Sequence, residues 1–386
     1  MPMLLDGIRV LELSQYLAGP YAGMILADLG AEVIKVAQPG LRQIGSGGLN
    51  SDDFVFMATH RNKRCITLDL KAPRGKEVFF DLAQKADVVL DNYRPGVLER
   101  LGIDYAKVNA KNPRIVSCSI TGFGSTGPYK DKPAFDIIVQ AMSGGMSITG
   151  NPPPARSGLS IGDCVGGMWA VQGIVAALYS RQQTGTGYRL EVSLLGGQIA
   201  LLHSRVPSYF YARKLTEGPD RPGPTYRVYE TKDGHIIIAA VGDRFWLPVC
   251  KALDCEDLAT DPKFDSVAKR VENRDELTSR IQEIMLGKTT EEWLTRFDSE
   301  DVPAGPVNTI DRAVTDPQVL HQQMVVPVDW SEGEPIWLAG NPIKVSGMEQ
   351  VFKSPPTIGQ HTQEILSGLL GYSAGKIAEL TTSKVI

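Results

Sequence analysis

The sequence predicts an α/β fold, in which a mostly parallel sheet with helices on both faces is followed by a smaller α+β domain. Between residues 7 and 120, short apolar runs alternate with longer helical segments, which is the pattern of βαβ units. The segment 168–180 contains no proline and is typical of a buried helix. Beyond residue 225 the alternation ends, and a hairpin pattern precedes further helical segments. A chain of 386 residues is long enough for two domains.

Five apolar runs bounded by turn residues predict the strands of the parallel sheet. These strands are Gly7–Leu13, Val33–Val36, Ile66–Leu70, Asp87–Leu90 and Ile115–Ile120. The helical segments near them are Tyr21–Leu29, Pro73–Ala86 and Val97–Val108, and Leu190–Ser204 adds a further strand and helix. The first turn reads LAGPYAG, which lacks the third glycine of a dinucleotide fingerprint, and no acidic residue ends the second strand. A nicotinamide cofactor is therefore not expected.

A Pro/Gly-rich segment, Leu215–Pro224, predicts a linker to the second domain. Beyond it, Tyr226–Thr231 and His235–Ala240 flank an Asp-Gly turn, which predicts a hairpin. The predicted helical segments of this domain are Phe245–Leu258, Glu272–Leu286 and Thr290–Phe297. The later elements are a strand at Val302–Pro306, the segment Thr309–Asp316, a helix containing His321, a segment at Pro342–Val345 and a final helix at Thr362–Leu370.

Composition and cysteine spacing argue against several classes of protein. A net charge of −4 argues against a nucleic-acid partner, which a strongly basic surface would attract. Five cysteines without CxxC spacing fit neither a disulfide framework nor a zinc site, so we expect reduced thiols and no metal. Charged residues interrupt the N-terminal apolar segment, and no apolar run approaches the roughly 18 residues of a membrane span. The sequence therefore predicts a cytoplasmic protein without a membrane partner.

Asp163 is the candidate catalytic residue. It stands at the start of the long helical segment, where Gly162, Gly166 and Gly167 leave little side-chain bulk around it. An aspartate at this position is a favoured N-cap, because its carboxylate accepts hydrogen bonds from free backbone N–H groups. The glycines favour a second interpretation, since they let a ligand approach closely and a carboxylate can act as a nucleophile. Position alone leaves both interpretations open.

Four stretches of the sequence, in this order, resemble class III CoA-transferases of the CaiB/BaiF type. They are LDGIRVLELSQYLAGPYAGMILADLGAEVIKV at 5–36, NKRCITLDLK at 62–71, DNYRPGVLERLG at 91–102 and TGFGSTGPYKDKPAFDIIVQAMSG at 121–144. The likeness runs over nearly the whole chain. It implies an enzyme that moves CoA from an acyl-CoA donor to an organic acid acceptor, with CoA present as a substrate and no permanently bound cofactor.

The resemblance also implies a fold and an assembly. The fold is a Rossmann-like large domain and a smaller domain, in two ring-like subunits that thread through each other. The large domain would comprise residues 1–205 and 330–386, the small domain 225–310, and the linkers 206–224 and 311–329. An interlocked homodimer of this kind is obligate, because neither subunit can leave without partial unfolding.

Specific residues take on roles through the resemblance. It identifies Asp163 as the nucleophile that attacks the thioester and forms an aspartyl mixed anhydride. It places Asp136 opposite this nucleophile, but Asp136 also begins a helical segment, so a capping role is equally open. Gln38 stands where the family commonly has a basic contact after the second strand. The CoA contacts that the resemblance implies are Tyr16, Leu17, Ala18, Leu68, Lys71, Asn92, Tyr93, Arg94 and Arg100.

Two other functions stay open at this point. Racemases of the same family move a proton with a His–Asp pair, but Phe135 occupies the histidine position and cannot exchange a proton. A CoA-binding dimer without catalysis is the second alternative, and the intact Asp163 with its glycines argues against it. Arg156 could bind a second carboxylate, so we expect dicarboxylic acyl groups such as succinyl. Proline stiffens residues 221–226, where the formyl-CoA branch has a glycine-rich gating loop.

Overall fold

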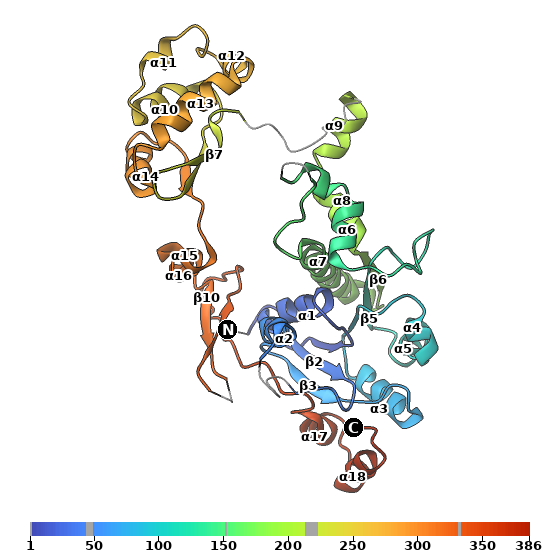
Figure 1. The fold of residues 1–386 in the computed structure, drawn as a ribbon. Helices are drawn as coiled ribbons and strands as arrows, with labels where there is room; N and C mark the ends of the chain where they lie inside the picture. Colours follow the sequence, from blue (N-terminus) through green and yellow to red (C-terminus); the bar gives the residue numbers. More distant parts are fainter. Residues whose placement is uncertain (1, 44–48, 151–152, 213–222, 331–332) are drawn as a thin grey trace. The chain divides into compact units, whose positions relative to one another are not determined.

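The computed structural model describes residues 2–43, 49–150, 153–212, 223–330 and 333–386. Its contacts divide the chain into a large unit, Met1–Pro219 with His321–Ile386, and a small unit, Asp220–Leu320. Both termini lie in the large unit (Figure 1). The expected linker Leu215–Pro224 falls mostly outside the described residues. Parts of the two wider linkers, 206–224 and 311–329, are regular structure instead, because helix α9 covers Arg205–Ala212 and strand β10 covers Val325–Val328.

The large unit is built on a six-stranded sheet in the order β3-β2-β1-β4-β5-β6. Each neighbouring pair is parallel, with Val10 of β1 paired to Val33 of β2 on one side and to Val88 of β4 on the other. The predicted parallel sheet is therefore confirmed. The strands are β1 (Arg9–Glu12), β2 (Glu32–Ala37), β3 (Arg64–Thr67), β4 (Val88–Asp91), β5 (Val116–Thr121) and β6 (Arg189–Ser193).

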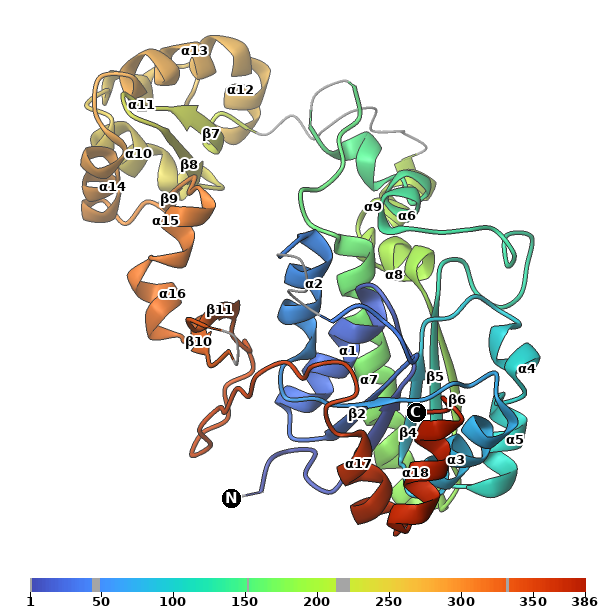
Figure 2. The same ribbon diagram turned by 60° about the horizontal axis from the view of Figure 1, so that its bottom comes forward.

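Two apolar cores cover the two faces of this sheet, because successive side chains of a strand point to opposite faces. Val10 and Val33 belong to the core that packs against α1 (Ala18–Asp28) and α7 (Ile161–Thr184). Leu11 and Ile34 belong to the core that contains residues of α3, α5 and the C-terminal helices (Figure 2). The bounds of those helices are α3 Pro73–Gln84, α5 Tyr105–Lys111 and α18 Ala374–Thr382, and the core residues Ile365 and Leu366 lie in the π-helical turn Ile365–Leu369 that follows α17 (Thr362–Glu364).

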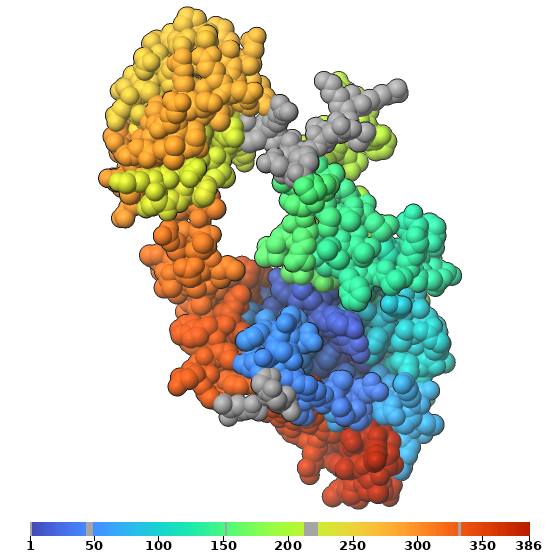
Figure 3. Space-filling model, viewed as in Figure 1, coloured from blue at the N-terminus to red at the C-terminus, as the bar shows by residue number. Residues whose placement is uncertain are grey.

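The C-terminal segment packs against the N-terminal part of the chain (Figure 3). The backbone N–H of Asp69 donates to the carbonyl oxygen of Val385 at 2.8 Å. Arg61 is almost fully buried, pairs with Asp28 at 2.7 Å, and donates to the carbonyl of Ala339. Residues from both ends of the sequence therefore complete the large unit.

Helix α7 differs from the prediction in two ways. It begins at Ile161, so Asp163 lies inside its first turn and not before it. It is also not buried on all sides, since Met168, Trp169 and Tyr179 are exposed. Among the described residues, α7 is the one helix long and apolar enough to cross a membrane, but half of its most apolar window is buried in the fold, as in a core helix.

The small unit contains the predicted hairpin. Strands β7 (Tyr226–Glu230) and β8 (His235–Ala239) are antiparallel, and β9 (Ala304–Pro306) pairs with β8. The single helix predicted at Phe245–Leu258 is two helices, because Asp254 adopts a left-handed conformation with φ of 54° between them. The helices are α10 Trp246–Ala252, α11 Asp257–Thr260, α12 Val267–Glu272, α13 Arg274–Met285, α14 Thr290–Ser299 and α15 Ile310–Val314.

Several elements have no counterpart in the prediction. Helix α2 packs against the antiparallel pair of β10 and β11, with Met57, Val326 and Leu338 in one small core. The segment predicted to lead into the last helix, Pro342–Val345, is not a strand, and α18 follows the helix predicted to be the last. The remaining bounds are α2 Ser51–His60, α4 Val97–Leu101, α6 Asp136–Met142, α8 Leu194–Leu201, α16 Pro317–His321 and β11 Ile336–Ala339.

Candidate functional site

A cavity of about 330 Å³ lies beyond the carboxyl ends of β1, β4 and β5, and we call it the first cavity. Gln15–Ala18 after β1, Asn92–Pro95 after β4 and Ile120–Gly124 at the end of β5 form three of its walls. Asp163, in the first turn of α7, completes the lining near the strands. The strand order reverses between β1 and β4, and ligands of doubly wound sheets bind beyond the carboxyl ends of the strands at such a point.

A second cavity, of about 220 Å³, lies beyond the carboxyl ends of β2 and β3. Lys35, Gln38 and Leu68–Lys71 line it. Gln15 and Tyr93 belong to the walls of both cavities. The two cavities are therefore neighbours along one edge of the sheet.

The structure brings most of the expected site residues to these cavities. Those in the first cavity are Tyr16, Leu17, Ala18, Asn92, Tyr93, Arg94 and Asp163, and those in the second are Leu68, Lys71 and Tyr93. Arg100, Asp136 and Arg156 line neither cavity. Lys130 and Lys132 line the first cavity but were not expected, because they lie in an irregular loop without periodicity that only the fold brings to this place.

The turn between β1 and α1 is held in an unusual conformation. Tyr16 has a φ of 59°, a left-handed conformation that costs a non-glycine residue energy, and its ring is exposed and meets Phe135 edge to face. Asn92 fixes the turn, because its Oδ1 accepts from the backbone N–H of Gln15 and its Nδ2 donates to the Gln15 carbonyl, both at 2.7 Å. A Cβ atom at Gly19 would lie 2.2 Å from that of Ser14, so only glycine fits there. The amide of Asn92 therefore positions the cavity wall.

Asp163 is half-buried in a part of the helix where glycines allow close packing. A Cβ at Gly166 would lie 2.5 Å from Leu194, and one at Gly167 would lie 2.8 Å from the carbonyl oxygen of Ala18. Burial first, and then the negative charge of Asp136, raise the pKa of Asp163 to about 6. At neutral pH the side chain is ionised and poorly solvated, which is the state a carboxylate nucleophile needs.

Asp136 is a helix cap, but of a different helix than its position suggests. Its Oδ1 accepts from the backbone N–H of Gly162 in the first turn of α7, at 2.7 Å. Its Oδ2 accepts from Nε2 of Gln140 at 2.6 Å, and the same Gln140 amide also bonds the segment before α7 through Ser157 and Leu159. Asp136 makes no capping bond to its own helix, α6. It therefore holds the turn that carries Asp163.

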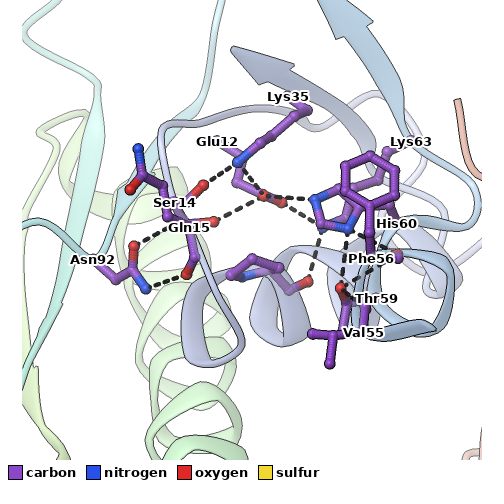
Figure 4. A network of polar contacts seen from close by, with 11 residues as sticks. Glu12, Ser14, Gln15, Lys35, Val55, Phe56, Thr59, His60, Lys63 and Asn92 are labelled. Carbon is purple, nitrogen blue, oxygen red and sulfur yellow. Dashed lines mark hydrogen bonds and ion pairs between the residues drawn. The ribbon is translucent and has the colours of Figure 1, made fainter. Parts of the chain in front are cut away.

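A buried group of charged residues lies beneath the β1–α1 turn (Figure 4). We call Glu12, Lys35, His60 and Lys63 the Glu12 cluster. Glu12 accepts from Nζ of Lys63 at 2.6 Å and from Oγ of Ser14 at 2.8 Å, while Nζ of Lys35 lies 3.5 Å from its Oε1. Lys35 also donates to the carbonyl oxygen of Ser14. The cluster therefore supports the backbone that separates the two cavities.

Comparison with known proteins identifies the family. The family described as CoA-transferase family III matches residues 5–362. Succinyl-CoA:glutarate CoA-transferase of Mus musculus is 36% identical over 99% of this chain and 90% of its own length. Succinyl-CoA--D-citramalate CoA-transferase of Chloroflexus aurantiacus is 35% identical over 100% of this chain and 98% of its own length. The crystal structure of a CAIB/BAIF family protein from Brucella suis superposes with a TM-score of 0.85 and 33% identity, covering 96% of this chain and 100% of that one. The chain therefore belongs to CoA-transferase family III, a family of enzymes that use CoA thioesters.

Proposed function

We propose that this enzyme transfers CoA from succinyl-CoA, or a similar dicarboxylic acyl-CoA, to a carboxylic acid, with Asp163 as the covalent nucleophile. Relatives about 35% identical are named as succinyl-CoA transferases that act on glutarate or D-citramalate, which supports this donor class. The expectation that Arg156 binds a second carboxylate is not part of the proposal, because Arg156 lines neither cavity.

The proposed reaction proceeds by exchange at two carbonyl groups. The Asp163 carboxylate attacks the thioester carbonyl, the C–S bond breaks, and CoA leaves as the thiolate while a mixed anhydride forms. The thiolate then attacks the aspartyl carbonyl of the anhydride, releasing the donor acid and leaving CoA on Asp163. The acceptor carboxylate attacks this new thioester, and the released thiolate takes the acceptor acyl group from the second anhydride. Asp163 is regenerated, and no net proton is consumed.

The observation that carries this proposal is the position of Asp163 in a cavity lined by three cationic side chains. Arg94, Lys130 and Lys132 line the first cavity together with Asp163. Their charge favours anionic substrates and stabilises the oxyanion and thiolate that form as the thioester is attacked. Backbone N–H groups in the first turn of α7 add to this stabilisation.

A trapping experiment tests the proposal. The enzyme is incubated with succinyl-CoA and then with hydroxylamine, which converts an activated aspartyl carbonyl to a hydroxamate. We expect peptide mass spectrometry to find this modification on Asp163 and transfer of CoA to dicarboxylic acids in a panel of acceptors. Binding of CoA without a modified Asp163 or any acyl transfer would favour the non-catalytic alternative.

The charge of Asp136 is expected to set part of the pH dependence. Since Asp163 must be ionised to attack, kcat/KM of the wild type should fall tenfold per pH unit below pH 6 or so. Asp136→Asn removes the neighbouring negative charge, so the pKa of Asp163 should fall and the acidic limb of the profile should move to lower pH. The pKa should stay above its ordinary value, because burial, the larger cause, remains.

The matched control for this pH prediction is Asp104→Asn. Asp104 caps another helix, α5, by accepting from the backbone N–H of Lys107, and asparagine can accept the same bond. Asp104→Asn therefore removes a carboxylate charge that is not among the causes of the raised Asp163 pKa. Its pH profile should coincide with that of the wild type. An acidic limb that stays in place in Asp136→Asn would show that Asp136 serves the fold alone.

Lys71 and Arg100 are expected to bind CoA without taking part in the chemical step. Replacing either with Ala should raise KM for the acyl-CoA by about tenfold to a hundredfold and leave kcat unchanged, because such contacts are equal in the ground and transition states. Both side chains are exposed, so added salt should reduce the difference from the wild type. Lys71 lines the second cavity and Arg100 lines neither, so the effect at Lys71 should be the larger.

Steady-state kinetics at two ionic strengths measure this difference. An unchanged KM in Arg100→Ala would remove Arg100 from the CoA contacts without affecting Lys71. A loss confined to kcat in either variant would contradict a binding role for that residue.

The interlocked homodimer and the cytoplasmic location stay predictions. Exposed apolar side chains on α7, among them Met168, Trp169 and Tyr179, support an assembly in which a second subunit covers this helix. Light scattering of the purified protein would measure its oligomeric state.

A further inference from the structure

The Glu12 cluster holds more positive than negative charge. Glu12 is the one carboxylate of the cluster and is fully buried between the ammonium groups of Lys63 and Lys35. His60 adds no charge, since burial first, and then the two lysines, lower its pKa well below the usual value. Burial also lowers the pKa of Lys63, but only to about 8, so it is charged at neutral pH. The cluster therefore carries one positive charge in excess (Figure 4).

Lys35 is the member of the cluster that reaches the second cavity. It lines this cavity, whereas Glu12, His60 and Lys63 do not. Its side chain is 9% exposed, and its ammonium group is held by the carbonyl oxygen of Ser14 and by Glu12 at 3.5 Å. Both oxygens of Glu12 have closer partners in Ser14 and Lys63, so the charge of Lys35 is the least compensated in the cluster.

The other charged groups of the second cavity do not cancel this charge. Asp69 and Lys71 line the cavity as one anion and one cation, and Oδ1 of Asp69 accepts from the backbone N–H of Lys71 at 2.9 Å. Gln38 contributes a neutral amide. Counting Lys35, the cavity wall carries a net positive charge, which fits an anionic group.

We propose that Lys35 is an anion-binding residue that holds a phosphate group of CoA in the second cavity. This inference rests on the proposed function, which makes CoA the ligand of the site. A cation already held in place by Ser14 and Glu12 loses little side-chain freedom when an anion arrives, and its charge acts through a poorly solvated region where attraction is strong. Lys35 thereby supplies the positive charge on the side where Gln38 follows β2.

Lys35 differs from Lys71 in a measurable way. Lys71 is exposed, so salt screens its charge, whereas the buried ammonium of Lys35 is screened much less. The contribution of Lys35 to CoA binding should therefore persist at high ionic strength, while that of Lys71 should shrink.

The test measures dissociation constants of Lys35→Met and Lys35→Gln for three ligands. Calorimetry serves for CoA and 3′-dephospho-CoA, and ligand-observed NMR serves for pantetheine, which has no phosphate. We expect both variants to bind CoA about tenfold to a hundredfold more weakly than the wild type and pantetheine equally well. If the variants lose affinity for CoA but not for 3′-dephospho-CoA, Lys35 binds the 3′-phosphate. If they lose affinity for both ligands, Lys35 binds the diphosphate.

Two variants serve as controls for this experiment. Lys35→Gln keeps a donor for the Ser14 carbonyl if Lys35→Met does not fold, and Lys111→Met removes an exposed lysine at the end of α5 and should bind all three ligands as the wild type does. An equal loss of affinity for pantetheine, or no loss of affinity for CoA, would overturn the role of Lys35. Failure of the wild type to bind CoA would instead contradict the proposed function.

Discussion

Asp163→Asn is expected to abolish CoA transfer and, at pH 7, to make the protein more stable. The amide cannot attack a thioester, so turnover should fall by more than about a thousandfold. The same substitution removes a charge from a poorly solvated position next to Asp136, where the pKa of Asp163 is raised to about 6. Asp163 would then be a catalytic residue whose ionised side chain makes the folded protein less stable than a neutral amide at the same position.

The sign of the stability change follows from proton binding. Because the folded-state pKa of Asp163 lies above the unfolded value, the folded protein holds more protons between about pH 4 and pH 6. Its stability therefore decreases as pH rises through this window, and the penalty is fully present at pH 7. Relief of that penalty in Asp163→Asn should raise the free energy of unfolding by about 1–3 kcal/mol at pH 7 and by little at pH 4.

Denaturant unfolding at the two pH values and a CoA-exchange assay measure these effects. Asp52→Asn is the control, since Asp52 is an exposed carboxylate in the first turn of another helix, α2, and its replacement should change stability by about 0.5 kcal/mol or less. Asp163→Ala should be as inactive as Asp163→Asn. Turnover above a few per cent of the wild type in either variant would exclude the covalent mechanism. A loss of stability at pH 7 in Asp163→Asn would contradict the destabilising effect of the buried Asp163 charge.

The parallel sheet could be predicted because its strands are buried on both faces and appear as apolar runs. Val10 and Leu11 are both fully buried, although they face opposite cores, so no alternation is needed to recognise the strand. Helix α2 was missed for the opposite reason. Its buried positions include polar side chains such as Asp53, Thr59 and His60, so hydrophobic periodicity does not mark it.

The burial of α7 within a single chain was overestimated, because an apolar composition does not say what covers a helix. Met168 and Trp169 would satisfy a core position, yet both are exposed in the described chain. The first residue of the helix was also missed, because Gly162 and Asp163 are poor helix formers that the bond from Gly162 to Asp136 holds in the first turn. Contacts between distant residues decided both features.

Most of the site residues expected from the sequence line the two cavities, but the Glu12 cluster beneath them was not expected. Residues that follow the strands, such as Tyr93 and Lys71, could be expected at the carboxyl edge once the parallel order was known. The Glu12 cluster joins positions 51 residues apart and carries no local motif. A signal was nevertheless present, since Glu12 and Lys35 are charged residues inside apolar strands, and such positions require a partner when they are buried.

Glu12→Gln is expected to destabilise the protein strongly, although Glu12 lines neither cavity. Glu12 is the carboxylate that compensates two buried ammonium groups. Burial alone would raise its pKa, but Lys63 and Lys35 outweigh this effect and lower it, so the side chain is ionised. Removing one partner of a buried ion pair leaves the other uncompensated, which costs about 3–5 kcal/mol.

Urea denaturation of Glu12→Gln, Lys63→Met and the double variant measures the free energy of the interaction between Glu12 and Lys63. The double variant should lose less stability than the two single variants together, because it leaves neither an isolated carboxylate nor an isolated pair of lysines. Glu32→Gln is the matched control on the neighbouring strand β2. Glu32 pairs with Arg9 and Arg64 but is 31% exposed, so its loss should cost about 1 kcal/mol or less. Suppose that Glu12→Gln lost no more free energy of unfolding than Glu32→Gln. Lys35 and Lys63 would then have to be uncharged or in contact with water, and the excess positive charge that Lys35 is proposed to offer to CoA would not exist.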